Sequence, residues 1–516
     1  MTSDTSSGGT GSEPLRRIPA HRLSAAVART AAKEGWEPAQ ALIERHWDFY
    51  ASRSPQHLLA AIRALPGEAF IERPTMLVAA KFLQHVLAGG DPSHFNHGEW
   101  MDVATTGGNT GLMDTLGVLT GKTAALRTEG DLVGAAQVAR VAAAELDNAS
   151  EAEQSEVQIS LPHYRVQWAR SLELGEASGA DREYERAYDL SMATGQSAVA
   201  RRAAAQLAWF YAERGRLRTA ESWLARARAE KAINARYDAV VFLTEALIHI
   251  DRLDFAAAGR DLGRTRGLQE GEYWSAALWV ESMSARTAAI AAVVESDVAE
   301  SVERVGQTVA NGGAHGRYLR AARARLSALR RPPGDNTAMP EVSTTDRIIA
   351  AAAEQARGEH RKALALAAPA MQPSEPPRTH AAALLISAAA RMVLGQTARA
   401  VSLFEQAKAL IDTERIFTSY DWVPDKLLHA LARKGNTTLD VPDALESTRQ
   451  KAARDLTRRE TEVLVQLMTH KTMAEIADDL FISPNTLKST TRRLYRKIGA
   501  STRQDAIDFA HNTGGR

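Results

Sequence analysis

Apolar residues recur at intervals of three and four positions over most of this chain, from about residue 21 to about residue 434. This spacing places them on one face of successive amphipathic α-helices, which are separated by short segments containing Gly, Asp or Pro. Runs of β-branched residues, which favour strands, are few, whereas Ala, Leu, Arg and Glu are abundant. The pattern therefore predicts an all-α protein.

One internal pattern of small and large apolar residues is clearest near the middle of the chain. Its positions are Leu207, Ala208, Tyr211, Gly215, Leu217, Ala220, Leu224 and Ala227. This is the spacing of a tetratricopeptide repeat, and it predicts two antiparallel helices. The alanines let the helices approach closely, Gly215 allows a left-handed turn between them, and the larger side chains fill the space between layers.

The second helix of this pattern recurs along the chain with an alanine at the equivalent position. These residues are Ala135, Ala180, Ala220, Ala258, Ala363 and Ala400. Adjacent copies lie 37 to 45 residues apart, which is wider than the usual spacing of about 34 residues. We predict a tetratricopeptide-like helical repeat superhelix. Ala-rich hairpins also occur in unrelated arrays, where they indicate only a surface for partners.

Changes in composition divide the chain into four parts. Residues 1–20, rich in Ser, Thr and Gly, are predicted to form a disordered tail. The helical repeat region spans 21–435, and a break is expected near 331–345, where Pro and Gly cluster. The polar segment 436–454 is predicted to be a linker, and 455–516 a separate C-terminal domain.

The C-terminal domain begins with a predicted scaffold helix over Thr457–Met468. Its apolar face carries Val463, Leu464 and Leu467. Thr472 and Glu475 then have the spacing of a capping box, in which each side chain satisfies an unpaired backbone N–H of the other residue. A short helix ending near Leu480 is predicted to follow this box.

A longer helix is predicted from Ser483 to about Ile498. Ser483 can act as N-cap, and Pro484 takes the first helical position, where a missing N–H costs nothing. Gly499 can provide a left-handed C-cap. A last helix is predicted over about 503–510, which gives the domain four helices.

The longer helix is strongly basic. Between Ser483 and Arg503 there is no acidic residue, and the basic residues are Lys488, Arg492, Arg493, Arg496, Lys497 and Arg503. The whole chain is nearly neutral, with 63 Lys and Arg against 62 Asp and Glu. A helix of one charge sign fits the phosphate backbone of a nucleic acid, although a solvated basic face has the same composition.

The segment 456–510, with its capping box, its Phe481-Ile482-Ser483 turn and its basic helix, resembles the helix-turn-helix domain of LuxR-type regulators. The resemblance implies double-stranded promoter DNA as a partner, with the basic helix lying in the major groove as the recognition helix. It implies base reading by Lys488, Ser489 and Arg492. It also implies phosphate contacts by Thr486, Arg493, Arg496 and Lys497.

The segment departs from the family pattern at two positions. The family commonly has His where this chain has Thr490, and Gly where it has His470. We expect Thr490 to alter one backbone contact. We expect His470 to close the turn after the scaffold helix differently, because a non-Gly residue at positive φ is uncommon.

The repeat spacing resembles that of MalT-like regulators, and residues 65–90 resemble the beginning of their superhelix. Such proteins often carry an ATPase module ahead of the repeats, and we expect none here. The segment Gly117–Thr123 resembles a Walker A loop but is one residue short and follows no buried strand. We therefore expect neither nucleotide binding nor another cofactor.

Other kinds of site have little support. The chain has no cysteine, which excludes disulfides and thiolate metal sites. His94, His97 and Glu99 lack a fourth ligand nearby, and no nucleophile–base pair has a diagnostic spacing, so we predict neither a metal site nor an enzyme. Without an apolar leader or a run of about 18 apolar residues, we expect a cytoplasmic protein that does not contact the membrane.

The function that these features favour is a transcriptional regulator whose repeat region senses a small-molecule or protein effector and controls DNA binding. We expect a homo-oligomer, at least a dimer on DNA, with RNA polymerase as a further candidate partner. Tryptophans of the repeats should pack between helices, although one or two could stack on a ligand in the groove: Trp168, Trp209, Trp223, Trp274 and Trp279. The alternative is a helical-repeat interaction scaffold with incidental DNA binding.

Overall fold

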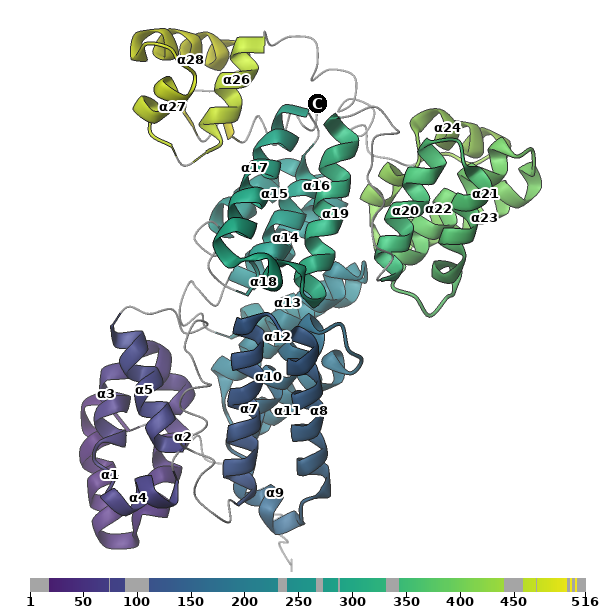
Figure 1. Cartoon of the computed structure of the whole chain (residues 1–516). Helices are drawn as coiled ribbons and strands as arrows, with labels where there is room; N and C mark the ends of the chain where they lie inside the picture. The colour runs from purple at the N-terminus through teal and green to yellow at the C-terminus, as the bar shows by residue number, and fades with distance from the viewer. Residues whose placement is uncertain are drawn as a thin grey trace, which may run out of the picture.

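The computed structural model describes residues 18–73, 75–88, 111–230, 239–265, 272–285, 288–330, 343–439, 458–469, 471–498, 502–503 and 506–507. Within these ranges all regular elements are helices, which confirms the all-α prediction. Figure 1 shows antiparallel helix pairs stacked in a central column, with further groups of helices beside it. The predicted tail and linker lie almost wholly outside the described residues.

The N-terminal helices form a group with its own core beside the column (Figure 1). They are α1 (Ala20–Glu34), α2 (Trp36–Arg53), α3 (Pro55–Ile62), α4 (Gly67–Glu72) and α5 (Thr75–Leu87). Leu23, Ile43 and Leu58 are fully buried in this core. The segment from Leu65, expected to begin the superhelix, supplies α4 and α5 to this group instead, because their apolar faces pack on α2 and α3.

The central column consists of helix pairs that follow the predicted repeat pattern. The pairs are α7 (Leu112–Glu129) with α8 (Leu132–Asn148), α10 (Leu161–Leu174) with α11 (Ala180–Ala193), α12 (Ser197–Glu213) with α13 (Leu217–Ala229), α14 (Ala239–Asp251) with α15 (Phe255–Thr265), and α16 (Trp274–Ser284) with α19 (Gly313–Arg330). The shorter α9 (Glu151–Val157) follows α8, while α17 (Ala288–Val305) and α18 (Gln307–Asn311) precede α19. The column is consistent with the predicted tetratricopeptide-like superhelix.

A further group of helices follows α19, at the right of Figure 1. It contains α20 (Thr344–Ala356), α21 (His360–Ala367), η3 (Ala368–Met371), α22 (Pro377–Val393), α23 (Thr397–Glu414), η4 (Phe417–Trp422) and α24 (Asp425–Lys434). The break predicted near 331–345 falls between α19 and α20, and residues 331–342 lie outside the described ranges.

The small residues of the repeat pattern occupy the closest contacts. The side chains of all six repeat alanines, from Ala135 to Ala400, are completely buried. Gly215 has a φ of 80°, in the left-handed region that favours glycine. A Cβ at Gly215 would also lie 2.9 Å from the backbone nitrogen of Arg378, at the start of α22. Gly215 therefore permits both the turn after α12 and the approach of α22.

The tryptophans named above are all at most 9% exposed, which confirms that they pack between helices. Trp209 lies edge-on to Trp279, with ring centroids 6.3 Å apart. The Walker-like segment lies within helix α7, where Thr120 and Thr123 are buried and Trp168 Nε1 donates to Thr120 Oγ1 at 2.8 Å. His94, His97 and Glu99 lie outside the described residues.

Buried ion pairs connect helices that are far apart in sequence. Glu272, just before α16, accepts bonds from Arg127 of α7 at 2.8 Å and from Arg170 of α10 at 3.2 Å. Burial alone would raise the pKa of Glu272, but the two guanidinium charges outweigh it and lower the pKa from 4.5 to about 2. Glu272 therefore stays ionised and links separate layers of the column.

A second such contact joins the column to the group after α19. Arg378 of α22 donates to both carboxylate oxygens of Asp251, at the end of α14, at distances of 2.9 and 2.6 Å. The same guanidinium also donates to the carbonyl oxygens of Ala212 and Glu213. The Asp251 side chain is completely buried and also accepts a bond from Thr418.

Within the described ranges, no helix is both long and apolar enough to cross a membrane. The same residues contain no group of three or more His, Cys, Asp or Glu side chains arranged to hold a metal ion.

Candidate nucleic-acid interface

The C-terminal domain contains the predicted helices within a few residues of their expected ends: α26 (Arg458–Leu467), α27 (Met473–Asp479) and α28 (Pro484–Ile498). Their apolar faces meet in a small core whose completely buried members are Val463, Leu467, Ile476, Ala477, Leu487, Leu494 and Ala506. Most of the predicted last helix lies outside the described residues.

Both predicted N-terminal caps are present. Thr472 Oγ1 accepts the Glu475 backbone N–H at 3.3 Å, and Glu475 Oε2 accepts the Thr472 backbone N–H at 2.6 Å. The bonds that the Glu475 carboxylate accepts from the backbone N–H and the hydroxyl of Thr472 lower the pKa of Glu475, so the capping box is made with an ionised carboxylate. At the start of α28, Ser483 Oγ accepts the Thr486 backbone N–H at 3.1 Å. The caps fix where α27 and α28 begin.

The turn between α27 and α28 carries an exposed aromatic side chain. Phe481 has a φ of 50° and is 95% exposed, an uncommon backbone conformation for a bulky residue. Backbone bonds from Phe481 to Asp478 and from Ile482 to Ala477, both 3.0 Å long, hold the turn closed. The sequence predicted a turn here but gave no indication of the exposed ring.

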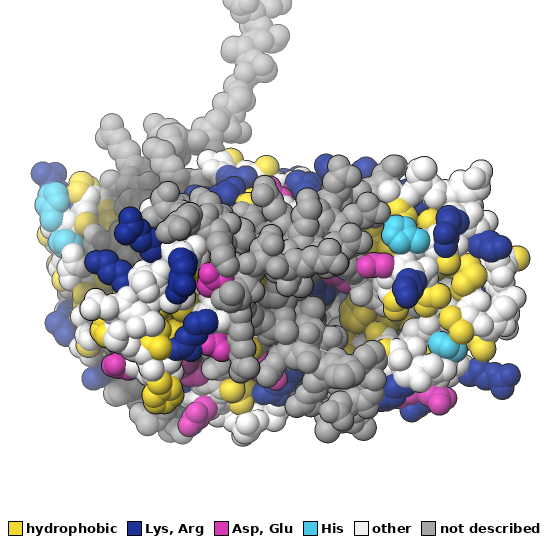
Figure 2. Space-filling view, turned by 90° about the horizontal axis from the view of Figure 1, so that it is seen from above, with side chains coloured by type: hydrophobic (Ala, Val, Ile, Leu, Met, Phe, Trp, Pro, Cys, Tyr) yellow, Lys and Arg dark blue, Asp and Glu magenta, His cyan; other side chains and the backbone are white. Residues whose placement is uncertain are grey.

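The basic helix α28 presents one polar face to solvent. Leu487 and Leu494 point into the core, whereas the exposed side chains are those of Thr486, Lys488, Ser489, Arg492 and Arg493. The side chains of Arg496 and Lys497 lie outside the described set. Seen from above, Lys and Arg side chains are exposed on the side of the molecule where this domain lies, and others are exposed on the opposite side (Figure 2). The arrangement suits a polyanionic partner.

Residues 454–510 match the family described as GerE: Bacterial regulatory proteins, luxR family. The C-terminal domain is a LuxR-family helix-turn-helix domain. The match supports a transcriptional regulator. It covers none of the repeat region, so the resemblance of that region to MalT-like regulators stays a prediction. No curated protein matches the chain.

The departures from the LuxR pattern have different outcomes. Thr490 is 3% exposed, and its hydroxyl donates to the Thr486 carbonyl at 2.9 Å. The Thr490 hydroxyl is therefore engaged within α28. His470 lies outside the described residues.

Arg503, one of the basic residues counted in the sequence, has a structural contact in the LuxR-family domain. Its guanidinium donates to the carbonyl oxygens of Leu467 and Thr469 at 2.8 and 2.6 Å. These bonds satisfy carbonyl groups at the end of α26, which would otherwise lack partners. Charge counting could not separate Arg503 from the solvent-exposed arginines of α28.

The LuxR-family domain also packs against the central column, next to α17 (Figure 1). One continuous apolar cluster joins Leu464 of α26 and Met468, just after α26, to Ile290 and Val294 of α17. At its edge, a hydrogen bond to Asp479 raises the pKa of Lys471, and the charge of Glu300 on α17 contributes to the rise. The contact uses α26 and leaves Lys488 and Arg492 on α28 exposed.

Proposed function

We propose that this protein is a sequence-specific transcriptional regulator whose helix α28 enters the major groove of promoter DNA. The observation that carries the proposal is the exposed basic face of α28 within a LuxR-family domain. The caps at Thr472 and Ser483 support it, because they fix the helix before DNA is bound.

We assign base reading to Lys488, Ser489 and Arg492. Lys488 and Arg492 are one helical turn apart and share a face, so both can reach the edges of neighbouring bases. Each can donate to guanine O6 and N7, whereas Ser489 can donate or accept and specifies little. In the free protein Ser489 Oγ donates to the Thr486 carbonyl at 2.9 Å.

We assign phosphate contacts to Thr486, Arg493, Arg496 and Lys497. These contacts would position the helix without reading sequence, and they would make binding depend strongly on salt. A single domain of this size binds weakly, so we propose that two copies read two half-sites. The repeat region, residues 21–435, would then hold the copies together and receive an effector.

A truncation tests whether the LuxR-family domain carries DNA binding. A DNA site selected from a random library with the full chain should bind the full chain in a salt-dependent manner, measured by fluorescence anisotropy. Deleting residues 455–516 should abolish that binding. Binding that survived the deletion would contradict the proposal and favour a scaffold that contacts DNA through another surface.

Two arginine substitutions test the assignment within α28. Arg492→Ala should lower the preference for the selected site over unrelated DNA by roughly 10- to 100-fold, because it removes a base contact. Arg496→Ala should weaken binding to both DNAs alike and reduce the salt slope by about one. Anisotropy titrations on both probes at several salt concentrations measure these effects. Equal losses on both probes for both variants would overturn the assignment.

A further inference from the structure

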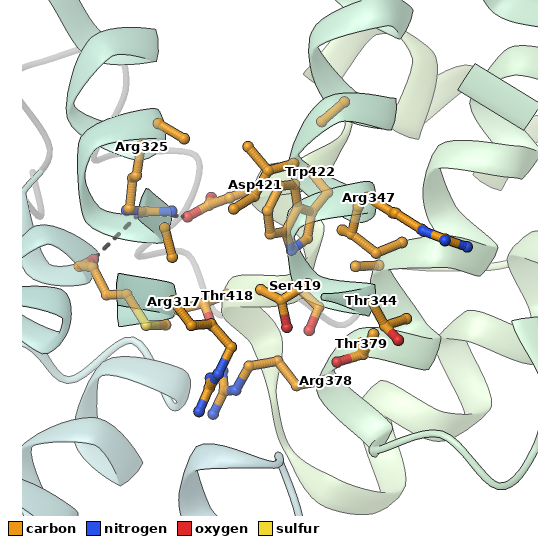
Figure 3. A pocket seen from close by; sticks show the side chains of 18 of the residues that line it. Arg317, Arg325, Thr344, Arg347, Arg378, Thr379, Thr418, Ser419, Asp421 and Trp422 are labelled. Atoms are coloured by element: carbon orange, nitrogen blue, oxygen red, sulfur yellow. Dashed lines mark hydrogen bonds and ion pairs between the residues drawn. The ribbon is translucent and has the colours of Figure 1, made fainter. Parts of the chain in front are cut away.

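A large cavity lies between the central column and the group of helices after α19. Its volume is about 1280 Å³, and it is bounded by α19 on one side and by α20, α22 and η4 on the other (Figure 3). Sites for drug-sized organic molecules occupy about 300–1,000 Å³. The cavity is therefore large enough to hold such a molecule, and it is distinct from the DNA-reading face.

Ion pairs join α19 to the group of helices that forms the other wall of the cavity. Arg325 of α19 pairs with Asp421 of η4 at 2.9 Å, and Figure 3 shows this pair beside the cavity. Arg320 of α19 donates to both carboxylate oxygens of Asp346 at the start of α20, at 2.8 and 3.0 Å. The pair of Arg378 with Asp251, described above, is a third contact of this kind. These contacts fix the position of the two walls relative to each other.

Three arginines of the wall already have partners of opposite charge. Arg317 pairs with Glu176 and Glu213, as Arg325 does with Asp421 and Arg378 with Asp251. Burial opposes ionisation of Glu213, but the charge of Arg317 outweighs it and lowers the Glu213 pKa, so the pair stays charged. A charged ligand would have to compete with these pairs.

Arg347 and Glu375 also line the cavity, and neither has an ion pair with another described residue. Their opposite charges offset one another, and the guanidinium of Arg347 points away from the space beside η4 (Figure 3). The charges of the lining therefore favour an uncharged occupant.

One buried polar group in the wall lacks a partner. Ser419 of η4 is 2% exposed, lines the cavity, and its Oγ has no hydrogen-bond partner among the described residues. Leaving a buried hydroxyl unpaired is unfavourable, and this hydroxyl can both donate and accept. Figure 3 shows Ser419 between the walls of the cavity, whose lining also includes Thr344 and Thr379. The geometry suits a ligand with an amide or hydroxyl group.

The rest of the lining is aromatic and aliphatic. The ring of Trp279 stacks on Tyr318 with centroids 5.4 Å apart, and Trp422 lies on the opposite wall. Met283 and Ile348 add aliphatic surface. Flat apolar surfaces of this kind stack well on an aromatic ring.

We propose that this cavity binds an uncharged organic molecule with an aromatic ring and an amide or hydroxyl group, and that this molecule is the effector. The identification as effector rests on the proposed function as a regulator. A route to the DNA-binding domain exists, because α19 lines the cavity and packs on α17, on which α26 is docked.

Three probes with the same ring and different charge test the ligand class: 2-(2-naphthyl)acetamide, 2-naphthylacetate and 2-(2-naphthyl)ethylamine. Binding to the full chain is measured by saturation-transfer difference NMR. The uncharged amide is expected to bind, and the anion and the cation to bind at least about fivefold more weakly, because most charges of the wall are already paired and the unpaired Arg347 and Glu375 offset one another. An anion or cation that bound as well as the amide, or an amide that failed to bind, would overturn the proposal.

Substitutions in the wall locate the site. Ala324→Trp, on the cavity side of α19, should abolish amide binding by filling the space, whereas Ala398→Trp on the exposed surface of α23 should not. Ser419→Ala should weaken amide binding roughly three- to tenfold. The thermal midpoint of the Ser419→Ala variant should stay the same or rise, because the Ser419 hydroxyl has no protein hydrogen-bond partner to lose. Unchanged binding in either cavity variant would contradict this site.

The probe experiment is independent of the DNA experiment. A chain that binds its selected DNA site but not the amide would overturn only the effector site. A chain that binds the amide but no DNA would overturn the proposed regulator and leave the cavity assignment standing.

Discussion

Arg378→Met is expected to lower the free energy of unfolding by about 3–5 kcal/mol. The substitution leaves the Asp251 carboxylate, which is completely buried, without its charge partner. It also removes the bonds to Ala212 and Glu213 that join α22 to the end of α12. Urea denaturation of the full chain, followed by circular dichroism, measures the change.

Two further variants show whether the unpaired charge causes the loss. Arg361→Ala removes an exposed arginine of α21 and should change stability by less than about 0.5 kcal/mol. Adding Asp251→Asn to Arg378→Met should restore part of the lost stability, because no buried charge then remains without a partner. A loss below about 1 kcal/mol for Arg378→Met would show that this contact does not hold α22 to the column.

Glu272→Gln is expected to cost about 2–3 kcal/mol at neutral pH. The side chains of Arg127 and Arg170 are only 6% and 2% exposed, so water cannot replace the lost carboxylate. The lowered pKa of Glu272 sets the pH dependence. The ionised carboxylate of Glu272 contributes its full stabilisation above pH 4.5, which is the pKa of this group in the unfolded chain. This stabilisation is lost as the pH falls toward about 2, the pKa of Glu272 in the folded protein.

Denaturation of the two proteins from about pH 7 to about pH 3 tests this linkage. The difference in stability between wild type and Glu272→Gln should be constant above about pH 5.5 and should narrow at lower pH. Glu405→Gln, on the exposed surface of α23, should show no such trend. A difference independent of pH would mean that the ionised carboxylate of Glu272 does not stabilise the fold.

The sequence predicted those parts of the fold that depend on local pattern. The hairpin from Leu207 to Ala227 follows from apolar spacing, and the caps at Thr472 and Ser483 follow from side chains that bond to backbone three residues away. The separate packing of α1 to α5 could not be predicted, because an amphipathic face shows that a helix is covered without showing by what.

Long-range polar contacts were missed for the same reason. Glu272 meets Arg127 and Arg170 across 145 and 102 residues, distances at which sequence spacing carries no information. At the DNA-binding face, the exposed side of α28 could be read from its charge pattern. The engagement of Arg503 with α26 and the cavity between α19 and η4 could not, because both depend on the relative placement of whole helices.

The contact between α26 and α17 implies that release of the DNA-binding domain depends on the concentration of the protein. Separating the two helices would uncover apolar side chains, among them Ile290 and Val294, and exposed apolar patches favour association with other molecules. A second copy could cover the same surface that α26 leaves. Release of the DNA-binding domain and self-association would then become mutually reinforcing, and the response to the proposed effector would steepen as the protein accumulates.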